Sequence, residues 1–400
     1  MKYWRGYLTA AIFGFFSWLL IEFAAGHPGL IDTVYPYVTR MLQSLLAEWS
    51  SGVDFCLWQF IVIVFVVGVI TSAVLMIVLR WNLLQWAGWV IAPLGIVFFL
   101  HTAIYGLNSY AGSIADDIRL DVTEYTLSEL EEATVFFRDQ ANALALEVDR
   151  DANGDAKYPS FSELAQQAGE GFDSLVYDHS YSIFAGSLLP VKELGWADMY
   201  TSMGITGFTL SITGEAAVNP QIPIVSMPFT MCHEMAHRMS IALESDANMA
   251  AFLACTANPN VEFQYSGYYM AYRYCYNAIS SLGTANAREA AKRISAGVND
   301  AFYHDLSSYD RFFASKKNET AKEVADTVND TYIKVNGDEQ GLASYGAVCD
   351  LLVSWHIREY ILPLQTEEET KFDPFDESQV DLSGIVNART EYAADVQSTQ

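Results

Sequence analysis

Long apolar runs dominate the first quarter of the chain and then give way to mixed apolar and polar positions. The runs cover residues 7–23, 55–79 and 83–106. Each has roughly the length of a helix that crosses a hydrocarbon core of about 30 Å. We therefore expect three transmembrane helices within residues 1–106, which would make the lipid bilayer one partner of this protein.

Beyond residue 107, apolar positions recur mostly at the spacing of amphipathic helices. We expect one exterior domain over residues 107–364 and an acidic, partly disordered tail over residues 365–400. Two segments, 204–214 and 216–224, are instead rich in β-branched and aromatic residues and predict one or two short strands. The predicted helices cover residues 114–148 (one helix or two), 263–281, 286–298, 300–315, 320–334 and 343–360.

The positive charges around the apolar runs predict the orientation in the membrane. Lys2 and Arg5 precede the first run, and Arg80 lies in the short turn between the second and third runs. By the positive-inside rule, the N-terminus is cytoplasmic. Three crossings then place the exterior domain outside the cytoplasm, so we expect a multi-pass protein of the cell membrane with an extracytoplasmic domain.

The net charge of −26 falls on the part of the chain after residue 106, which carries 18 basic and 44 acidic residues. Such an acidic domain repels phosphate backbones and anionic head groups. We therefore expect no nucleic-acid partner.

The segment Ser226–Leu253 contains the motif His233-Glu234-Met235-Ala236-His237. Residues four apart lie on the same face of a helix, so both imidazoles can point at one metal ion. Glu234 is then placed to accept a proton from a metal-bound water rather than to bind the metal. This division of roles is typical of zinc hydrolases, and we expect one Zn²⁺ per chain.

A catalytic zinc ion usually has a third protein ligand. Glu244 is the strongest candidate, because Leu243 at the preceding position cannot coordinate a metal. Asp246 is the alternative donor. Asn248 lies one turn after Glu244 and is suited to a hydrogen bond that orients a ligand.

Other residues are weaker candidates for the chemistry of the site. The predicted strands precede the motif helix and could hold an extended peptide, so Glu215 and Asn219 lie near the cleft or simply cap turns. A donor to the oxyanion of the transition state could come from one of several aromatic side chains, although aromatic residues at helical spacing usually belong to the core. These candidates are Tyr265, Tyr268, Tyr345 and His356.

Two further patterns have more than one interpretation. The donors Asp149, Asp151, Asn153 and Asp155 resemble the first half of a calcium loop, but the closing glutamate is missing, since position twelve is Ser160. The alternative is a polar turn between helices. Cys232 points away from the predicted ligands and indicates a core thiol, whereas a disulfide among Cys255, Cys275 and Cys349 remains open.

Several short motifs stand out besides the His-Glu-x-x-His segment. They are Thr206-Gly207-Phe208, Thr213-Gly214-Glu215, Pro228-Phe229-Thr230, Tyr265-Ser266-Gly267-Tyr268, Asp330-x-Tyr332-x-Lys334-x-Asn336 and Ser344-Tyr345. Together they resemble an uncharacterised bacterial family, catalogued as a domain of unknown function, of three-pass membrane proteins regarded as zinc peptidases of the gluzincin type. The resemblance implies a zinc site at His233, His237 and Glu244, with Glu234 as the base. Ser240 departs from the family pattern, which has glycine there.

The sequence thus predicts a mainly α protein with three N-terminal transmembrane helices, a mostly helical gluzincin-like domain and a small β element beside the motif helix. The predicted function is hydrolysis of peptide bonds by a membrane-anchored zinc metallopeptidase. Two alternatives remain: a non-catalytic metal-binding sensor or scaffold, and a zinc amidase that acts on a cell-envelope substrate.

Overall fold

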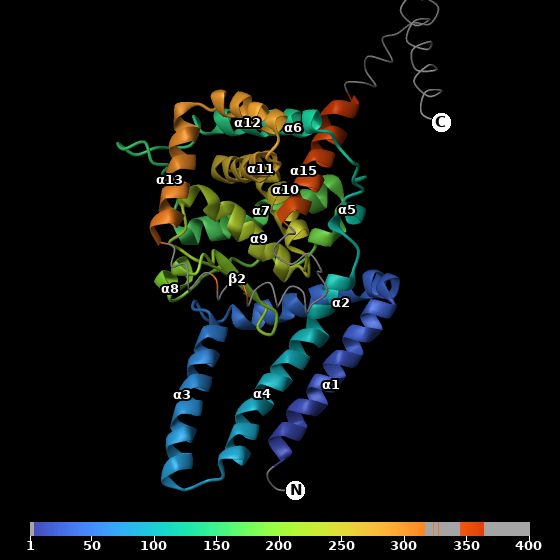
Figure 1. Cartoon of the computed structure of the whole chain (residues 1–400), viewed down its shortest axis with the longest axis vertical. Helices are drawn as coiled ribbons and strands as arrows, with labels where there is room; N and C mark the ends of the chain where they lie inside the picture. Colours follow the sequence, from blue (N-terminus) through green and yellow to red (C-terminus); the bar gives the residue numbers. More distant parts are fainter. Residues whose placement is uncertain (1–3, 317–322, 324–326, 328–344, 364–400) are drawn as a thin grey trace, which may run out of the picture. The chain divides into compact units, whose positions relative to one another are not determined.

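The computed structural model describes residues 4–316, 323, 327 and 345–363 (Figure 1). The chain divides into two units, Met1–Ser354 and Trp355–Gln400, and the first contains the apolar helices, the sheet and the motif helix. The described part of the second unit continues the last helix into a π-helical turn, Ile357–Ile361. Apart from residues 323 and 327, the predicted helix at 320–334 lies outside the described residues, as do the acidic tail and the motif that begins at Asp330.

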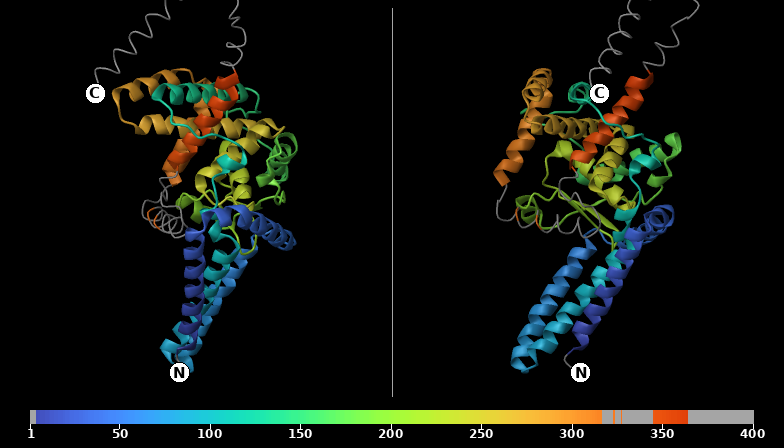
Figure 2. Two further views of the ribbon diagram at one scale, coloured as in Figure 1. Left: turned by 90° about the vertical axis from the view of Figure 1, so that its right-hand side faces the viewer. Right: turned by 45° about the vertical axis from the view of Figure 1, so that its right-hand side comes forward.

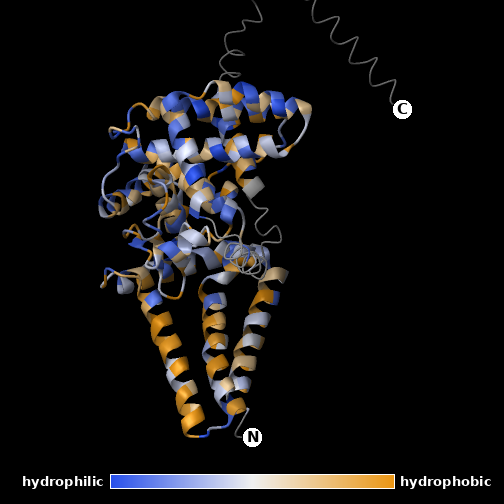
Figure 3. Ribbon diagram, turned by 60° about the vertical axis from the view of Figure 1, so that its left-hand side comes forward, coloured by the Kyte–Doolittle hydropathy of each residue, from blue (hydrophilic) through white to orange (hydrophobic). Residues whose placement is uncertain are grey.

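Three helices are long and apolar enough to cross a membrane: α1 (Arg5–Gly26), α3 (Leu57–Val78) and α4 (Leu83–Ile104). They are the predominantly orange helices in Figure 3. Small residues bring α1 and α4 into close contact, since a Cβ atom on Gly95 would lie 2.9 Å from Cα of Ala10. The prediction of three long apolar helices is confirmed, and as candidate membrane spans they suggest a multi-pass membrane protein.

The segment between the first two spans is a helix, α2 (Pro28–Ser50), which the sequence pattern did not predict. Pro36 lies inside it and interrupts the helical pattern, because proline removes a backbone donor from a helix interior. Figures 1 and 2 show α2 running across the ends of the three apolar helices. It also contacts η1 (Gly106–Tyr110), α9 (Met227–Arg238) and β3 (Glu215–Val218), which follow later in the chain.

Most of the described chain after residue 107 is helical, as predicted. The expected helix at 114–148 is interrupted: after the short α5 (Ile114–Asp117), Arg119 has a positive φ of 55°, and a capping box of Thr126 and Glu129 starts α6. The longer helices are α6 (Leu127–Leu144), α7 (Phe161–His179), α9 (Met227–Arg238), α10 (Glu244–Ala257), α11 (Val261–Ser281), α12 (Ala285–Ala296), α13 (Asp300–Lys316) and α15 (Tyr345–His356).

Helix α10 lies at the centre of the core. Its residues from Ser245 to Cys255 are all buried, and it packs against α7, α9 and α11. Gly171 of α7 meets the backbone of Ala254 so closely that even a Cβ atom would collide. This tight packing holds the first turn of α10, and therefore Glu244, in a fixed position beside α9.

A small sheet covers one side of α9. It has the order β1–β3–β2, from β1 (Lys192–Glu193), β3 (Glu215–Val218) and β2 (Gly207–Leu210). Strands β2 and β3 are antiparallel, with Gly207 opposite Val218, whereas β1 runs parallel to β3. The predicted fold class is confirmed: the protein is mainly helical, with three apolar N-terminal helices and a small sheet.

Candidate metal centre

Helix α9 positions the two histidines of the motif. Pro228 lies in its first turn, where the fixed φ of proline suits the start of a helix. Ser226 does not cap the helix, because its hydroxyl donates to the carbonyl of Pro223 at 2.9 Å. His233 and His237 lie one turn apart on the same face, with ring centroids separated by 4.6 Å.

A tight turn brings the third residue back to the histidines. Helix α9 ends at Arg238, and Ser240 has a φ of 71°. This is the left-handed region that favours glycine, the residue expected here from the family pattern. The chain reverses, and Glu244 is the first residue of α10. The buried guanidinium of Arg238 fixes this turn by donating to the carbonyls of Ser187 and Leu189.

The three side chains form the only group of at least three His, Cys, Asp or Glu residues in the described part of the chain that could hold a metal ion. The two Nε2 atoms are 3.1 Å apart, and carboxylate oxygens of Glu244 lie 3.4 Å from His233 Nε2 and 3.7 Å from His237 Nε2. Ligands bound to tetrahedral zinc at about 2.0–2.2 Å are about 3.3–3.6 Å from one another. The separations therefore fit one ion of this kind.

Hydrogen bonding orients the imidazole of His237. Its Nδ1 lies 2.8 Å from the carbonyl of Ile241, which can only accept, so Nδ1 carries the proton. The lone pair of a neutral ring is then on Nε2, facing the cluster. Tyr105, the residue after α4, donates its hydroxyl proton to the same carbonyl at 3.4 Å. Nδ1 of His233 is buried and has no partner among the described residues.

The histidines also determine the charge of Glu244, whose side chain is 24% exposed. Burial opposes its ionisation, but the hydrogen bond with His233 and the attraction of both imidazoles outweigh this and lower its pKa to about 2. An ionised carboxylate beside two imidazoles is a donor set that suits zinc.

Glu234 lies beside the cluster but is held by the sheet. Thr209 of β2 donates to its carboxylate at 2.7 Å and to its backbone carbonyl at 3.0 Å. Gly207 leaves room for it, since a Cβ atom there would lie 2.7 Å from Cγ of Glu234. Burial raises the pKa of Glu234 to about 7, although His237 and the Thr209 hydrogen bond lower it. A carboxyl group with such a pKa can accept and return a proton near neutral pH.

The two other polar residues predicted on α10 have different partners. The Asn248 carboxamide oxygen accepts from the hydroxyl of Tyr274 at 3.0 Å, and its Nδ2 has no partner among the described residues. Asp246, the alternative ligand, accepts from the backbone N–H of Ile114 at 2.9 Å and from Ser113 at 3.2 Å. Neither side chain therefore bonds to the histidines or to Glu244 in the described structure.

Glu215 and Asn219 follow the capping alternative. The carboxylate of Glu215 accepts from the backbone N–H groups of Leu57 and Trp58, the first residues of α3, and pairs with Lys192 at 2.7 Å. It satisfies donors that a helix start leaves free. Asn219 donates to the hydroxyl of Thr201 and to the carbonyl of Ile205. Their side chains are thus engaged in local structure rather than directed to a cleft.

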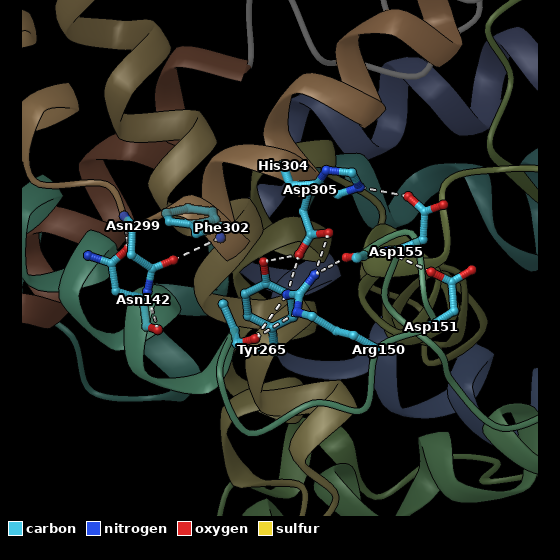
Figure 4. A network of polar contacts seen from close by, with 11 residues as sticks. Asn142, Arg150, Asp151, Asp155, Tyr265, Asn299, Phe302, His304 and Asp305 are labelled. Atoms are coloured by element: carbon cyan, nitrogen blue, oxygen red, sulfur yellow. Dashed lines mark hydrogen bonds and ion pairs between the residues drawn. The ribbon is translucent and has the colours of Figure 1, made fainter.

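Tyr265 belongs to a buried network away from the motif helix (Figure 4). Its hydroxyl donates to Asp305 at 2.6 Å, and Asp305 also accepts two bonds from Arg150, at 2.8 and 3.0 Å. A hydroxyl that gives its only proton to a buried carboxylate has none left to donate to an oxyanion in this arrangement. Tyr268 packs its ring against Phe136, Phe137 and Phe252. The side chain of Tyr345 lies outside the described residues, and His356 belongs to the second unit.

The calcium-like segment forms a polar turn. Asp151 accepts from the backbone N–H groups of Asn153 and Asp155, and Asp155 pairs with His304 at 2.8 Å. Asp149 contributes its backbone carbonyl to a bond with Lys157 N. Glu163, the nearest following acid, closes the capping box that starts α7. Asp151 is thus used within the turn, whereas Asp155 connects the turn to α13.

The five cysteines are free and buried. Cys232 lies in the core near the carbonyl of Ala168, as expected of a thiol on the far face of α9. Cys275 and Cys349 are neighbours, with sulfur atoms 3.5 Å apart, and Cys255 interacts with Cys232.

Three residues that support the site were not predicted: Tyr105, Thr209 and Gly207. Tyr105 contacts His237 from 132 positions away, so no local pattern could link the two. Thr209 and Gly207 lie in the strand predicted beside the motif helix, and that proximity was the available signal.

Comparison with known proteins identifies the family to which the chain belongs. No curated protein and no solved structure matches this chain. The model of the family described as "Protein of unknown function (DUF3810)" matches residues 31–353. This match extends from α2 to α15 and includes the whole His-His-Glu cluster, so the chain belongs to the DUF3810 family.

Proposed function

We propose that this protein is a membrane-anchored zinc metallopeptidase. The observation that carries the proposal is the convergence of His233, His237 and Glu244 at separations that fit tetrahedral zinc, with the buried carboxyl group of Glu234 next to them. Three protein donors and an adjacent acid–base group are the features of a catalytic zinc site.

A zinc ion bound here would supply Lewis-acid chemistry, polarising a substrate carbonyl and making water a stronger acid. His237 keeps its Nε2 lone pair directed at the cluster because Ile241 accepts its Nδ1 proton. Glu234 takes the proton of the attacking water and delivers it to the leaving amine. Thr209 fixes the carboxylate for this transfer by donating to one of its oxygens.

The position of β2 at the edge of the sheet favours a peptide as the substrate. In the described sheet, β2 pairs with β3 on one side only, and its residues Gly207 and Thr209 contact Glu234. An extended peptide can add to such an edge through main-chain hydrogen bonds. This would bring a peptide bond next to the acid–base group without requiring a particular side chain.

The competing scaffold function predicts a different coordination. A structural zinc site normally has four protein ligands, often with cysteine. The cluster in the described residues supplies three, and Cys232 is directed into the core near Ala168. This favours the enzyme. An amidase that cleaves a cell-envelope substrate would use the same chemistry, and only a substrate assay separates it from a peptidase.

The test is the metal content and activity of the full-length protein in detergent. We expect close to one zinc per chain in the wild type and in Asp246→Asn, and little in Glu244→Ala. Glu234→Gln should keep its zinc and lose hydrolysis of a library of quenched fluorescent peptides. Zinc retained in Glu244→Ala would show that Glu244 is not a zinc ligand. Activity retained in Glu234→Gln would refute the acid–base role proposed for Glu234.

A further inference from the structure

Helix α2 has an apolar face that no part of the described chain covers. Seven large apolar side chains on this face are 49–64% exposed. At 100° per residue they fall within a stripe about 120° wide. One carboxylate, Glu48 in the last turn, also lies in the stripe and is exposed. The seven are Leu30, Val34, Tyr37, Val38, Met41, Leu45 and Trp49.

The opposite face of α2 is polar and packs against the exterior region. Gln43 donates to the carbonyl of Ser211 at 3.0 Å, and Thr39 donates to Asn108 at 3.2 Å. Ala47 is buried where α2 meets the turn at Gly214. The apolar stripe therefore points away from the sheet and from the helices that hold the metal cluster.

Both ends of α2 are joined to helices that can span a membrane. A single residue, His27, separates α2 from α1, and the six residues 51–56 separate it from α3. Its first half is tied to the third span, since the hydroxyl of Tyr35 donates to the carbonyl of Thr102 in the last turn of α4 at 3.0 Å. These connections place α2 at the level where the three spans leave the lipid (Figures 1 and 3).

We propose that α2 is a membrane-surface helix whose apolar face lies in the head-group region of the lipid leaflet at that end of the spans. Amphipathic helices in this position bury their apolar side by about 5–10 Å. Tyr37 and Trp49 suit the interface, where aromatic rings with a polar group are enriched. The stripe contains no Lys or Arg. The hydrophobic effect therefore drives the contact between α2 and the lipid, and this contact does not need anionic lipids.

The polar face of α2 connects the lipid surface to the metal centre. Arg40 donates to the carbonyl of Met239 at 3.2 Å and to that of Ser182 at 3.0 Å. Met239 begins the turn that returns the chain from His237 to Glu244. Tyr105, directly after α4, bonds to Ile241 in the same turn. The turn that positions the third ligand is thus attached to two elements at the membrane surface.

This attachment specifies a substrate class: polypeptide segments that lie close to a membrane surface. That consequence rests on the proposed peptidase function, whereas the position of α2 does not. The position of α2 and the metal centre can fail separately, and the experiment measures each of them.

The test uses the full-length chain in nanodiscs of zwitterionic lipid, with spin labels on single introduced cysteines. The five native cysteines are buried. Wild-type protein treated with the same spin-label reagent shows whether any of them reacts. Labels at Met41→Cys and Leu45→Cys probe the stripe, where the native side chains are 63% and 62% exposed. Leu282→Cys, at an exposed position after α11, and Val66→Cys, within α3, serve as aqueous and lipid references.

Electron paramagnetic resonance measures how often each spin label collides with oxygen and with a water-soluble nickel complex. The ratio of the two collision rates reports the depth of the label in the lipid. We expect the oxygen-to-nickel ratio at Met41 and Leu45 to be several times that at Leu282 and below that at Val66. A ratio equal to that at Leu282 would overturn the proposal, as would dipolar broadening between copies, which would show that a second protein covers the stripe. Trp49→Cys provides a third site if either variant fails to fold. The zinc content of the same samples tests the metal centre independently.

Discussion

Replacing Ser240 with glycine should stabilise the protein by about 1–2 kcal/mol. Ser240 has a φ of 71°, and the left-handed region costs an L-residue about 1–2 kcal/mol relative to the right-handed one. The residue is only 5% exposed, and its hydroxyl has no partner among the described residues. Such an unsatisfied group costs about 1 kcal/mol or more. Glycine offsets about 0.5–1 kcal/mol of this gain, because it makes the unfolded chain more flexible.

The assay is thermal unfolding of the full-length protein in one detergent with zinc in fixed excess, since a bound ligand itself shifts the midpoint. Ser240→Gly should raise the midpoint by about 2 °C or more. Ser245→Gly is the matched control: this residue is helical in α10, so glycine there should lower stability by about 0.5 kcal/mol. A neutral or destabilising Ser240→Gly would show that the turn between α9 and α10 does not need a left-handed residue.

Two other substitutions test parts of the structure that the metal assay does not reach. Gly207→Ala should lower turnover by about 100-fold, because a Cβ atom 2.7 Å from Cγ of Glu234 must displace the acid–base group; unchanged turnover with normal zinc content would contradict the role given to β2. Asp305→Ala should cost about 3–5 kcal/mol of unfolding free energy, because it leaves the Arg150 guanidinium without its buried partner. Denaturant unfolding measures this, and a loss below about 1 kcal/mol would mean that the network in Figure 4 does not stabilise the fold.

The parts of the fold that the sequence predicts are those encoded over short distances. A membrane span needs only about 20 consecutive apolar residues, so α1, α3 and α4 are visible without a structure. The alignment of His233 with His237 follows from the helical repeat alone. Glu244 could be singled out because it is the first residue after α9 that can both coordinate a metal and open a new helix.

The supporting residues could not be identified one by one from the sequence. Tyr105 comes from a distant segment and approaches the site only when α4 has packed against the motif helix. Thr209 lies in the strand predicted beside that helix, but only the packing of β2 shows that its hydroxyl reaches Glu234. Tyr265 has the opposite explanation: a tyrosine on a helix looks like a donor in the sequence, and only the position of Asp305 shows where its proton goes. Helix α2 was missed for a third reason. Its apolar face meets no protein among the described residues, and Pro36 inside the segment is a residue that usually interrupts a predicted helix.

These distant contacts bear on how the apolar helices relate to the metal centre. Arg40 and Tyr105 both lie before residue 107, and both bond to carbonyls in the turn between α9 and α10. Residues 1–106 therefore contribute directly to the position of Glu244, in addition to attaching the chain to a membrane. A fragment that begins at residue 107 would lose these bonds, and the buried carbonyl of Ser211 would lose the hydrogen bond that Gln43 of α2 donates. Binding of a metal ion at the cluster must consequently be measured on the full-length protein.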